Sequence, residues 1–355
     1  MEIAYVGPVP PLTGGIAQHG ARSTQALVAA GHTVHIHSWA SQYPKLLYRG
    51  PAADHGARLR DDAHFELQWW DPRSWWRAGR SARRTDLLVF PWVTPVTAPA
   101  YRTILAAASP TPAVAIVHNL RPHEPRPGDA ALTKWVLARL KGALLHTRAD
   151  VSLLESWAPR TRVAWVPHPP NLDMSAEGPP PAPPHRLLFF GHVRPYKGLD
   201  IALEALRILL QRGVRVELTV AGHFWEPVET WQKDIARSEL TAAVTLRPGY
   251  VSDPDAARLF ADLHVVIAPY RTATQSGIVP LALAARRPIV ATQVGGLSET
   301  VTEGVTGSLS PPDDPSAFAA AIERALALPV PLPPAGDSVA GSWADVAKCI
   351  VELGR

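Results

Sequence analysis

Cysteine is almost absent from this chain, since Cys349 is the single one among 355 residues. A lone cysteine excludes an intramolecular disulfide and fits a reducing compartment. Long apolar runs are also missing, because proline, arginine or aspartate interrupts every candidate membrane span. The first residues, MEIAYVG, read as a strand and lack the basic flank and apolar core of a signal peptide. These absences predict a cytoplasmic protein, either soluble or bound peripherally at the inner face of the membrane.

Signatures of nucleic-acid binding are missing as well. No zinc-finger, RRM or helix-turn-helix pattern is present, so nucleic acid is not expected as a partner. Charge is nevertheless uneven along the chain. Residues 1–170 hold 19 Lys and Arg against 11 Asp and Glu, whereas the remainder holds 16 against 20. A basic first half predicts an anionic partner or surface for that half.

Proline, by contrast, is abundant, with 37 residues. The segment from Pro167 to Pro184 is crowded with prolines, which resist regular structure and form a stiff connector. The length of the chain also favours two domains over one. We therefore predict a first domain over 1–169, a linker over 170–185 and a second domain over 186–335.

Apolar runs alternate with helical patterns in both halves, without hairpin signals. This alternation predicts an α/β fold with a parallel, doubly wound sheet in each domain. Strands are expected at Ile3–Val6, Thr33–Ser38, Asp86–Val89, Ala113–Val117, Val163–Val166, Leu187–Phe190, Val216–Ala221, Val244–Leu246, Val265–Ala268 and Ile289–Ala291. Helices are expected from Ile16 to the stop at Gly31 and over Leu199–Arg212, Ile278–Ala285, Ser316–Leu328 and Ser342–Leu353.

The stretch LLFFGHVRPYKGLDI carries the clearest candidate site. An apolar strand ends at Gly191, and Arg194 and Lys197 follow before the next helix begins. Ligands of open α/β sheets bind where strands end, and a tight loop could aim both cations at one anion, such as a diphosphate. The alternative is two solvated cations on a surface loop.

Two features of the first half lie where ligands of such a sheet bind. Gly14 and Gly15 precede a helix, so a ligand could approach free backbone N–H groups there. His118 lies just beyond the carboxyl end of the strand Ala113–Val117. The alternatives are an ordinary glycine loop and a histidine that only hydrogen-bonds within its loop.

Two further loops of the second half follow strands. Val251 lies in the GYVS loop after Val244–Leu246, and Thr274, Gln275, Ser276 and Gly277 open the helix that begins at Ile278. Small residues at a helix start leave N–H groups available to an anion. Simple N-capping by Thr or Ser is the alternative.

Basic residues and tryptophans are interleaved in two segments of the first half. Residues 69–84 read WWDPRSWWRAGRSARR, and residues 132–148 mix Trp135 with lysine and arginine. Such a surface could lie on anionic lipid headgroups or hold a lipid-linked acceptor. The pattern of aromatics on one helical face favours the other interpretation, in which the tryptophans face the core and the arginines face water.

In their order and spacing, these motifs together resemble the GT-B glycosyltransferases, and among them the large retaining family 4 (glycosyl transferases group 1). The matching pieces are Gly14-Gly15, His118-Asn119, GHVRPYKG, GYVSD at 249–253 and GIVPLALAARRPIVATQVGGLSE at 277–299. The resemblance implies two Rossmann-like domains facing across a cleft. The first would bind the acceptor and would be joined by the C-terminal helix 338–355, whereas the second would bind the nucleotide-sugar donor.

The resemblance also implies roles for individual residues. Arg194 and Lys197 would hold the donor diphosphate and stabilise its charge as it leaves, and His118 would contact the donor sugar near the reacting carbon. The backbone of Gly15 would approach the phosphate or the acceptor, and the loop around Val251 would meet the nucleotide base. Gly14 and Gly191 are further candidates for binding the donor.

The implied activity is that of a retaining hexosyltransferase of class EC 2.4. The donor would be a UDP- or GDP-type nucleotide-diphosphate sugar, and the acceptor would be a sugar, lipid-linked or small-molecule hydroxyl. The leaving phosphate would help to deprotonate that hydroxyl. The resemblance implies that no cofactor and no metal are required, and no DxD-type carboxylate pair stands in a plausible donor position to contradict that.

One departure from the family concerns its two glutamates, eight positions apart. Aligned on Gly277, these positions hold Thr274 and Ala282, as in a subgroup with an ATQSG-like sequence. Gln275, Ser276 and the amides of Gly277 and Ile278 are the expected substitutes in holding sugar and ribose, with Glu299 more distant. The missing glutamates leave open a non-catalytic sugar-nucleotide or glycan-binding protein. A sugar-nucleotide epimerase on the same fold is a third alternative, although the carboxylates and histidines it needs cannot be assembled from this sequence.

Overall fold

The computed structural model describes residues 1–42, 61–122, 126–172, 174, 178, 180, 182–274, 276–333 and 341–355. The chain forms two compact units, each of which is considered by itself. Unit 1 comprises residues 1–171 and 341–355, and unit 2 comprises residues 172–340. Parts of the predicted linker 170–185, the end of the predicted second domain and residues 338–340 of the predicted C-terminal helix lie outside the described residues.

Unit 1 is built on a parallel sheet of seven strands in the order β3-β2-β1-β4-β5-β6-β7. The central strands are apolar throughout and fully buried, as parallel strands covered on both faces must be. The order reverses between β1 and β4, which is where doubly wound sheets bind ligands. The strands are β1 (Glu2–Val6), β2 (Thr33–Ser41), β3 (Ala63–Gln68), β4 (Leu87–Trp92), β5 (Ala113–Val117), β6 (Gly142–Leu145) and β7 (Arg162–Trp165).

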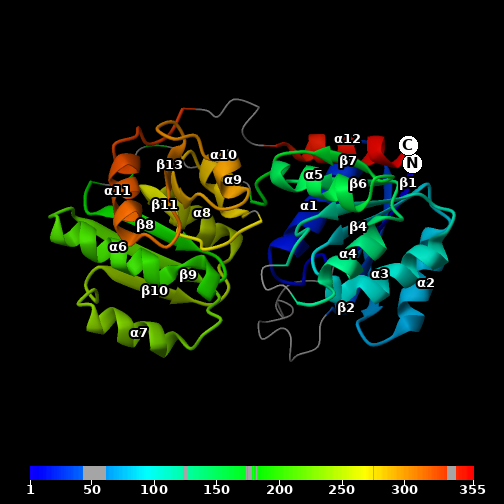
Figure 1. The fold of residues 1–355 in the computed structure, drawn as a ribbon, viewed down its shortest axis with the longest axis horizontal. Helices are drawn as coiled ribbons and strands as arrows, with labels where there is room; N and C mark the ends of the chain where they lie inside the picture. The colour runs from blue at the N-terminus through cyan, green and yellow to red at the C-terminus, as the bar shows by residue number, and fades with distance from the viewer. Residues whose placement is uncertain are drawn as a thin grey trace. The chain divides into compact units, whose positions relative to one another are not determined.

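Helices cover both faces of this sheet (Figure 1). The helices α2, α3, α4 and α5 bury apolar residues against one face, and α1 and α12 bury theirs against the other. The helices are α1 (Gly15–Ala29), α2 (Pro72–Ala82), α3 (Ala98–Ala108), α4 (Asp129–Leu137), α5 (Val151–Trp157) and α12 (Trp343–Gly354), with short 3₁₀ turns η1 (Pro95–Thr97) and η2 (Arg148–Asp150).

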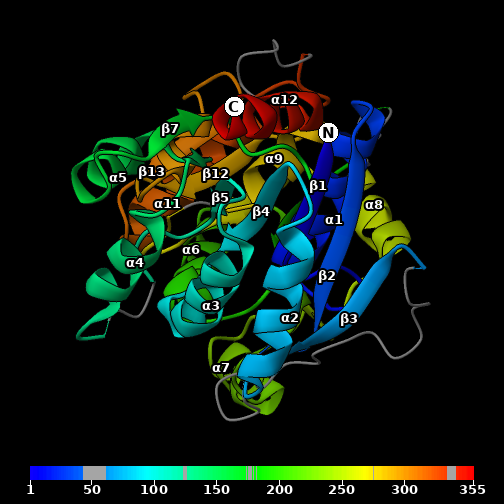
Figure 2. The ribbon, with the colours of Figure 1, turned by 90° about the vertical axis from the view of Figure 1, so that its right-hand side faces the viewer.

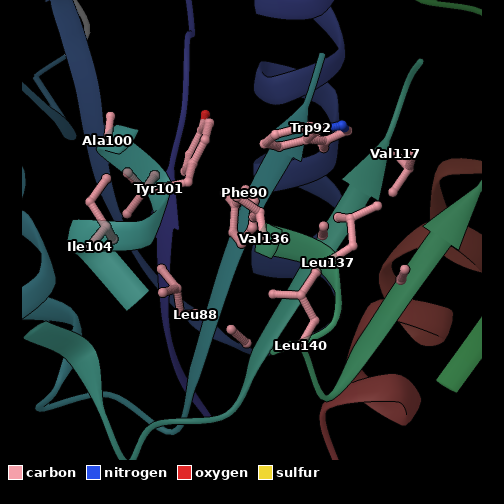
Figure 3. Packing of buried hydrophobic residues seen from close by; sticks show 14 of the residues in the cluster. Leu88, Phe90, Trp92, Ala100, Tyr101, Ile104, Val117, Val136, Leu137 and Leu140 are labelled. Carbon is pink, nitrogen blue, oxygen red and sulfur yellow. The ribbon is translucent and has the colours of Figure 1, made fainter. Parts of the chain in front are cut away.

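The core between β4 and its helices is aromatic (Figure 3). Phe90 of β4 stacks on Tyr101 of α3 with ring centroids 4.4 Å apart, and Ile104 of α3 and Leu137 of α4 lie on either side of the strand. Stacking of this kind fixes α3 against the sheet beyond what apolar burial alone would do. The packing leaves α2, α3 and α4 side by side on one face of the sheet (Figure 2).

The last helix, α12, packs within unit 1. It contacts α1 and the strands β5, β6 and β7. Val346, Ile350 and Leu353, which share one helical stripe, are buried there, and Ser342 caps the helix by accepting a hydrogen bond from the N–H of Asp345. The final residues of the chain therefore complete the core of the unit in which the chain begins.

Unit 2 repeats this design with six parallel strands in the order β10-β9-β8-β11-β12-β13. Its order reverses between β8 and β11. The strands are β8 (His185–Phe190), β9 (Val216–Gly222), β10 (Val244–Pro248), β11 (Val265–Ala268), β12 (Ile289–Thr292) and β13 (Gly307–Ser310). On one face lie α6 (Leu199–Gln211), α7 (Val228–Arg237) and α11 (Pro315–Leu326), and on the other lie α8 (Asp253–Ala261), α9 (Ile278–Ala284) and α10 (Leu297–Thr300).

The sequence pattern predicted the ten strands listed above, but it missed three. The strands β3 and β13 carry polar residues or glycine, and therefore lack a continuous apolar signal. The strand β6 lies inside the segment 132–148, where no strand was predicted. The core-facing interpretation of the tryptophans is wrong for four of them, which are 40%, 55%, 50% and 44% exposed: Trp69, Trp70, Trp76 and Trp135.

Candidate functional site

The loop that leaves β8 holds two cations at the point where the strand order of unit 2 reverses. Lys197 ends a short 3₁₀ turn, η3 (Pro195–Lys197), and its ammonium lies 4.9 Å from the centre of the Tyr270 ring, just beyond β11. Arg194 lies over Trp225 at 4.1 Å. Loss of hydration lowers the pKa of Lys197, but interactions with Tyr270 and Tyr196 outweigh it and raise the pKa above its usual value. The side chain is therefore fully charged at neutral pH.

Arg271 holds this loop in place from the other side of the reversal point. Its guanidinium donates to the carbonyl of Pro195 at 2.9 Å, and its backbone N–H donates to the carbonyl of Tyr196 at 2.7 Å. It also forms ion pairs with Asp200 at 2.6 Å and Asp313 at 2.8 Å. This role of Arg271 was not predicted, because no local sequence pattern indicates a hydrogen bond between residues 75 positions apart.

Gly198 follows Lys197 directly and adopts a left-handed conformation, with φ of 68°. A Cβ at this position would lie 2.1 Å from the carbonyl oxygen of Pro269. Only glycine therefore allows the loop to pass this close to the end of β11.

We expect Gly198→Ala to destabilise unit 2 by clearly more than the roughly 1–2 kcal/mol that left-handed backbone costs an alanine. The added methyl group must displace either the loop or β11. Gly213→Ala is the matched control, because Gly213 has φ of 81° but nothing within 4 Å of the added carbon. Urea denaturation of both variants measures the difference, and equal losses of stability would contradict the close approach.

Two histidines that the sequence analysis missed stand at the same edge. His192 follows β8 and His223 follows β9, with ring centroids 5.9 Å apart. Loss of hydration, and then the positive charges of Lys197 and Arg194, lower the pKa of His192 to about 4. The ring is therefore neutral at pH 7 beside two cations.

The other candidates of unit 2 lie in loops at this same edge, because each follows the carboxyl end of a parallel strand. Val251 lies between β10 and α8, and Thr274 lies between β11 and α9, where its carbonyl accepts a hydrogen bond from the N–H of Gly296. Glu299 is exposed in α10. Gln275 lies outside the described residues. The sheet topology thus confirms that these loops share one edge.

The start of α9 shows how its residues are held. Ser276 accepts a hydrogen bond from the N–H of Ile278 at 3.4 Å, and its hydroxyl lies 3.3 Å from that of Tyr270. Gly277 is the residue before the helix. The N-cap position of α9 is thus held by Gly277 without a side-chain cap, so simple N-capping by Thr or Ser, one of the two interpretations of this motif, is wrong. Ala282, aligned with a family glutamate, is fully buried in the apolar core, so a carboxylate there would be buried too.

In unit 1, the helix α1 begins without a side-chain cap. Gly14 precedes it with φ of 107°, and nothing lies within 4 Å of the position a Cβ would take. Gly15 is the first helical residue, and its carbonyl lies 3.5 Å from the amide nitrogen of Asn171. Gly14 itself supplies no side-chain cap to the first N–H groups of α1, and an anion site at a helix start would use such groups.

His118 lies where predicted, directly after β5, and its N–H donates to the carbonyl of Trp92. Its side chain is only 4% exposed, so any ligand could touch only a small part of the ring. It belongs to a cluster of four histidines, His19, His118, His146 and His168, which we call the histidine cluster. His146 follows β6, His168 comes shortly after β7, and His19 lies on α1.

Burial governs the protonation of this cluster. Loss of hydration, followed by the charge of His168, lowers the pKa of His118 to about 3. Loss of hydration lowers the pKa of His168 to about 4 and places the pKa values of His19 and His146 well below 6.5. All four rings are therefore neutral at pH 7. Within the described parts of the chain, no group of three or more His, Cys, Asp or Glu side chains has the geometry to hold a metal ion.

The fold is that of the GT-B glycosyltransferases, α/β with two Rossmann-like domains, which confirms the predicted fold class. Sucrose-phosphate synthase from Thermosynechococcus elongatus superposes with a TM-score of 0.67 at 16% identity, covering 100% of this chain and 95% of the other. Anabaena HepE in complex with UDP superposes with a TM-score of 0.66 at 16% identity, covering 100% and 97%. At these identities the likeness concerns the fold.

Sequence relatives point to the same class of protein. Residues 184–327 match the family model described as Glycosyl transferases group 1. The chain is 29% identical over 192 residues to the GDP-mannose:glycolipid 4-beta-D-mannosyltransferase of Xanthomonas campestris pv. campestris, covering 51% of this chain and 50% of that protein. It is 35% identical over 141 residues to a D-inositol 3-phosphate glycosyltransferase of Paenarthrobacter aurescens, covering 39% and 34%. This chain thus spans at most about half the length of these two relatives.

Proposed function

We propose that this protein is a glycosyltransferase that moves a sugar from a nucleotide-diphosphate donor to an acceptor hydroxyl. The observation that carries the proposal is the pair Arg194 and Lys197, held by Arg271 at the reversal point of the unit 2 sheet. Two charged groups on a braced loop suit a donor diphosphate. Of the solved relatives, HepE is named as a complex with UDP.

In the proposed reaction, the acceptor oxygen forms a bond to the anomeric carbon while the bond from that carbon to the diphosphate oxygen breaks. The acceptor proton passes to the leaving diphosphate, whose developing charge Arg194 and Lys197 stabilise. We propose that the configuration is retained and that no metal takes part. Contacts of Gly14, Gly15 and His118 with the donor, of Val251 with the base, and of Ser276, Gly277, Ile278 and Glu299 with sugar and ribose remain predictions.

Incubation of the purified protein with a panel of UDP-, GDP- and dTDP-sugars tests the activity. At least one donor should release its nucleoside diphosphate when a suitable acceptor is present, and the rate should not change in EDTA. Tight nucleotide binding without turnover would instead favour a non-catalytic binding protein. The Xanthomonas relative is named for a β-linked product, so the stereochemistry needs its own test. NMR of the product gives it: the anomeric configuration of the donor should be kept, and the opposite configuration would contradict retention.

We further propose a lipid-linked acceptor, with unit 1 resting on an anionic membrane through α2. The inner face of α2 consists of small, buried residues. Gly79 on this face lies so close to α3 that a Cβ would come within 2.5 Å of the Ile104 carbonyl oxygen. The outer face carries Arg73, Trp76, Arg77 and Arg80, all exposed and spaced for one helical stripe.

The surroundings of α2 extend this surface. Trp69 and Trp70 are exposed just before the helix, and Arg80, Ser81, Arg83 and Arg84 line a concavity of about 330 Å³ at its end. Exposed tryptophans beside arginines suit the boundary between headgroups and acyl chains. No helix in the described parts of the chain is long and apolar enough to cross a membrane.

We expect vesicles of phosphatidylcholine with phosphatidylglycerol to pull down this protein, and binding to weaken as salt rises. Each arginine near an anionic surface contributes about 1 kcal/mol, so the pair Arg77→Gln and Arg80→Gln should lower partitioning roughly 10–30-fold. The control pair, Arg237→Gln and Arg258→Gln, removes the same charge from exposed positions of unit 2. Equal losses of vesicle partitioning in the two double variants would refute a specific membrane-binding surface on α2.

A further inference from the structure

A chain of hydrogen bonds runs through the histidine cluster, and it fixes where each proton lies. His146 Nδ1 lies 2.8 Å from the carbonyl oxygen of Val166, which can only accept, so His146 carries its proton on Nδ1. The Nε2 of neutral His146 is then an acceptor, and His19 Nε2, 2.9 Å away, must donate to it. His19 Nδ1 in turn accepts from the Ser23 hydroxyl at 3.1 Å. Each hydrogen bond in this chain thus allows only one tautomer for the next ring.

His19 lies at the centre of the cluster. Its ring centroid is 4.6 Å from that of His118, nearly perpendicular to it, and 5.3 Å from that of His168. On another side lies Trp343, the first residue of α12, at 4.8 Å. The titratable groups facing His19 are thus the three other histidines from the ends of β5 and β6 and from beyond β7, whereas α12 contributes a ring that does not titrate.

Packing alone does not account for this arrangement. A buried imidazole costs free energy unless its nitrogens are hydrogen-bonded, whereas leucine or phenylalanine would fill the same space without that cost. In a buried region, a fully satisfied polar chain selects one orientation of every ring in it. The ring that gains from such an orientation is His118, because it stands at the ligand-binding edge of the sheet.

We propose that His19 and His146 are positioning residues, which hold the His118 ring in one orientation at the carboxyl end of β5. His19 makes the contact, and His146 fixes the tautomer and the orientation of His19. The inference rests on the proposed function, in which His118 meets the donor sugar. It adds two residues, on α1 and after β6, that no motif of the sequence marks.

Histidine NMR tests the chain directly and needs no activity. In protein labelled with ¹⁵N-histidine, long-range ¹H–¹⁵N spectra at pH 7.5 should show His19 as the Nε2–H tautomer and His146 as the Nδ1–H tautomer. Both should stay neutral well below pH 6.5, because burial lowers the pKa of each ring. Averaged tautomers or a protonated ring at either position would overturn the proposal, whether or not any donor is turned over.

Variants then test the effect on His118. His19→Phe keeps an aromatic ring but removes both hydrogen bonds. His146→Asn keeps a donor for Val166 but has no atom at the position of Nε2, which accepts from His19. Both should shift the ¹⁵N signals of His118 and change the pH profile of turnover. We expect His19→Phe to lower kcat roughly 10²-fold, with donor KM changed far less.

His64→Gln is the control, because it removes an exposed histidine from β3 in the same unit. If a variant fails to fold, the tautomers of the wild-type protein still decide the matter. If no donor reacts but the tautomers and the His118 shifts are as expected, the proposed activity fails while the network stands. An unmoved His118 signal in a folded His19→Phe protein would overturn the positioning role.

Discussion

We expect Lys197→Ala to transfer sugar roughly 10²–10³-fold more slowly than the wild-type protein. The ammonium lies beside Gly191, 3.5 Å from where a Cβ would stand, and hence at the end of the central strand β8. A charge in this position would stabilise the diphosphate most strongly as it leaves. The loss should therefore appear in kcat more than in the KM for the donor, which steady-state kinetics can separate.

Two further variants sharpen this test. Lys233→Ala makes the same substitution at an exposed position of α7 and should leave turnover unchanged. Lys197→Arg keeps the charge but alters its geometry, so an intermediate rate is expected. If Lys197→Ala turned over as fast as Lys233→Ala, the assigned role of Lys197 would be wrong.

We also expect unit 1 to lose stability steeply as the pH falls from 7 to 5. Histidine in an unfolded chain titrates near pH 6.5, whereas the pKa values of His19, His118 and His146 are lowered by burial. Below pH 6.5 the unfolded chain binds protons that the folded unit does not. For His118 and His168, whose pKa values are lowered to about 3 and about 4, this costs about 2 kcal/mol of unfolding free energy each at pH 5, and the lowered pKa values of His19 and His146 act in the same direction.

A loss of about 4 kcal/mol from these two rings alone is a large part of the stability of a typical domain. Urea denaturation at pH 7, 6 and 5, followed by proteolysis at sites mapped to each unit, measures it. His146→Asn should reduce the change between pH 7 and 5, because it removes one of the buried rings, whereas His64→Gln leaves all four rings in place. If the unfolding free energy of unit 1 in the wild-type protein did not change between pH 7 and 5, the rings would have to be already protonated or accessible to water.

The two predictions concern different layers of the molecule. Lys197 is proposed to meet the ligand directly, and its loop is braced by Arg271. The histidine cluster is buried, and it is proposed to act through the orientation of the His118 ring. In both units the positioning groups come from strands or helices other than the one that bears the candidate residue.

The site in unit 2 could be predicted from the sequence because its signal is local. An apolar run ending at Gly191, followed by Arg194 and Lys197, already indicates a buried strand, a loop and two cations. The alternation of strands and helices then predicted a parallel sheet, and parallel strands bring their carboxyl ends to one edge. The brace by Arg271 was missed because it joins loops on two separate strands.

The histidine cluster could not be predicted in this way. Successive members of the cluster, which are His19, His118, His146 and His168, are separated by about 20 to 100 residues. Three of them follow strands that become neighbours only through the order β5-β6-β7. The strand β6 was itself missed, so His146 had no predicted place. Nor could the pattern of residues 69–84 decide which face of α2 is covered, since this depends on how closely Gly79 approaches α3.

The sequence by itself determined the fold class, most of the strands and the loop that carries Arg194 and Lys197. These features depend on patterns within about ten residues, where the spacing of apolar side chains dictates helix or strand. Only the tertiary structure decided which histidines meet, which tryptophans remain exposed and what braces the Lys197 loop. Those contacts arise when strand order and helix packing bring distant residues together, and no local spacing encodes them.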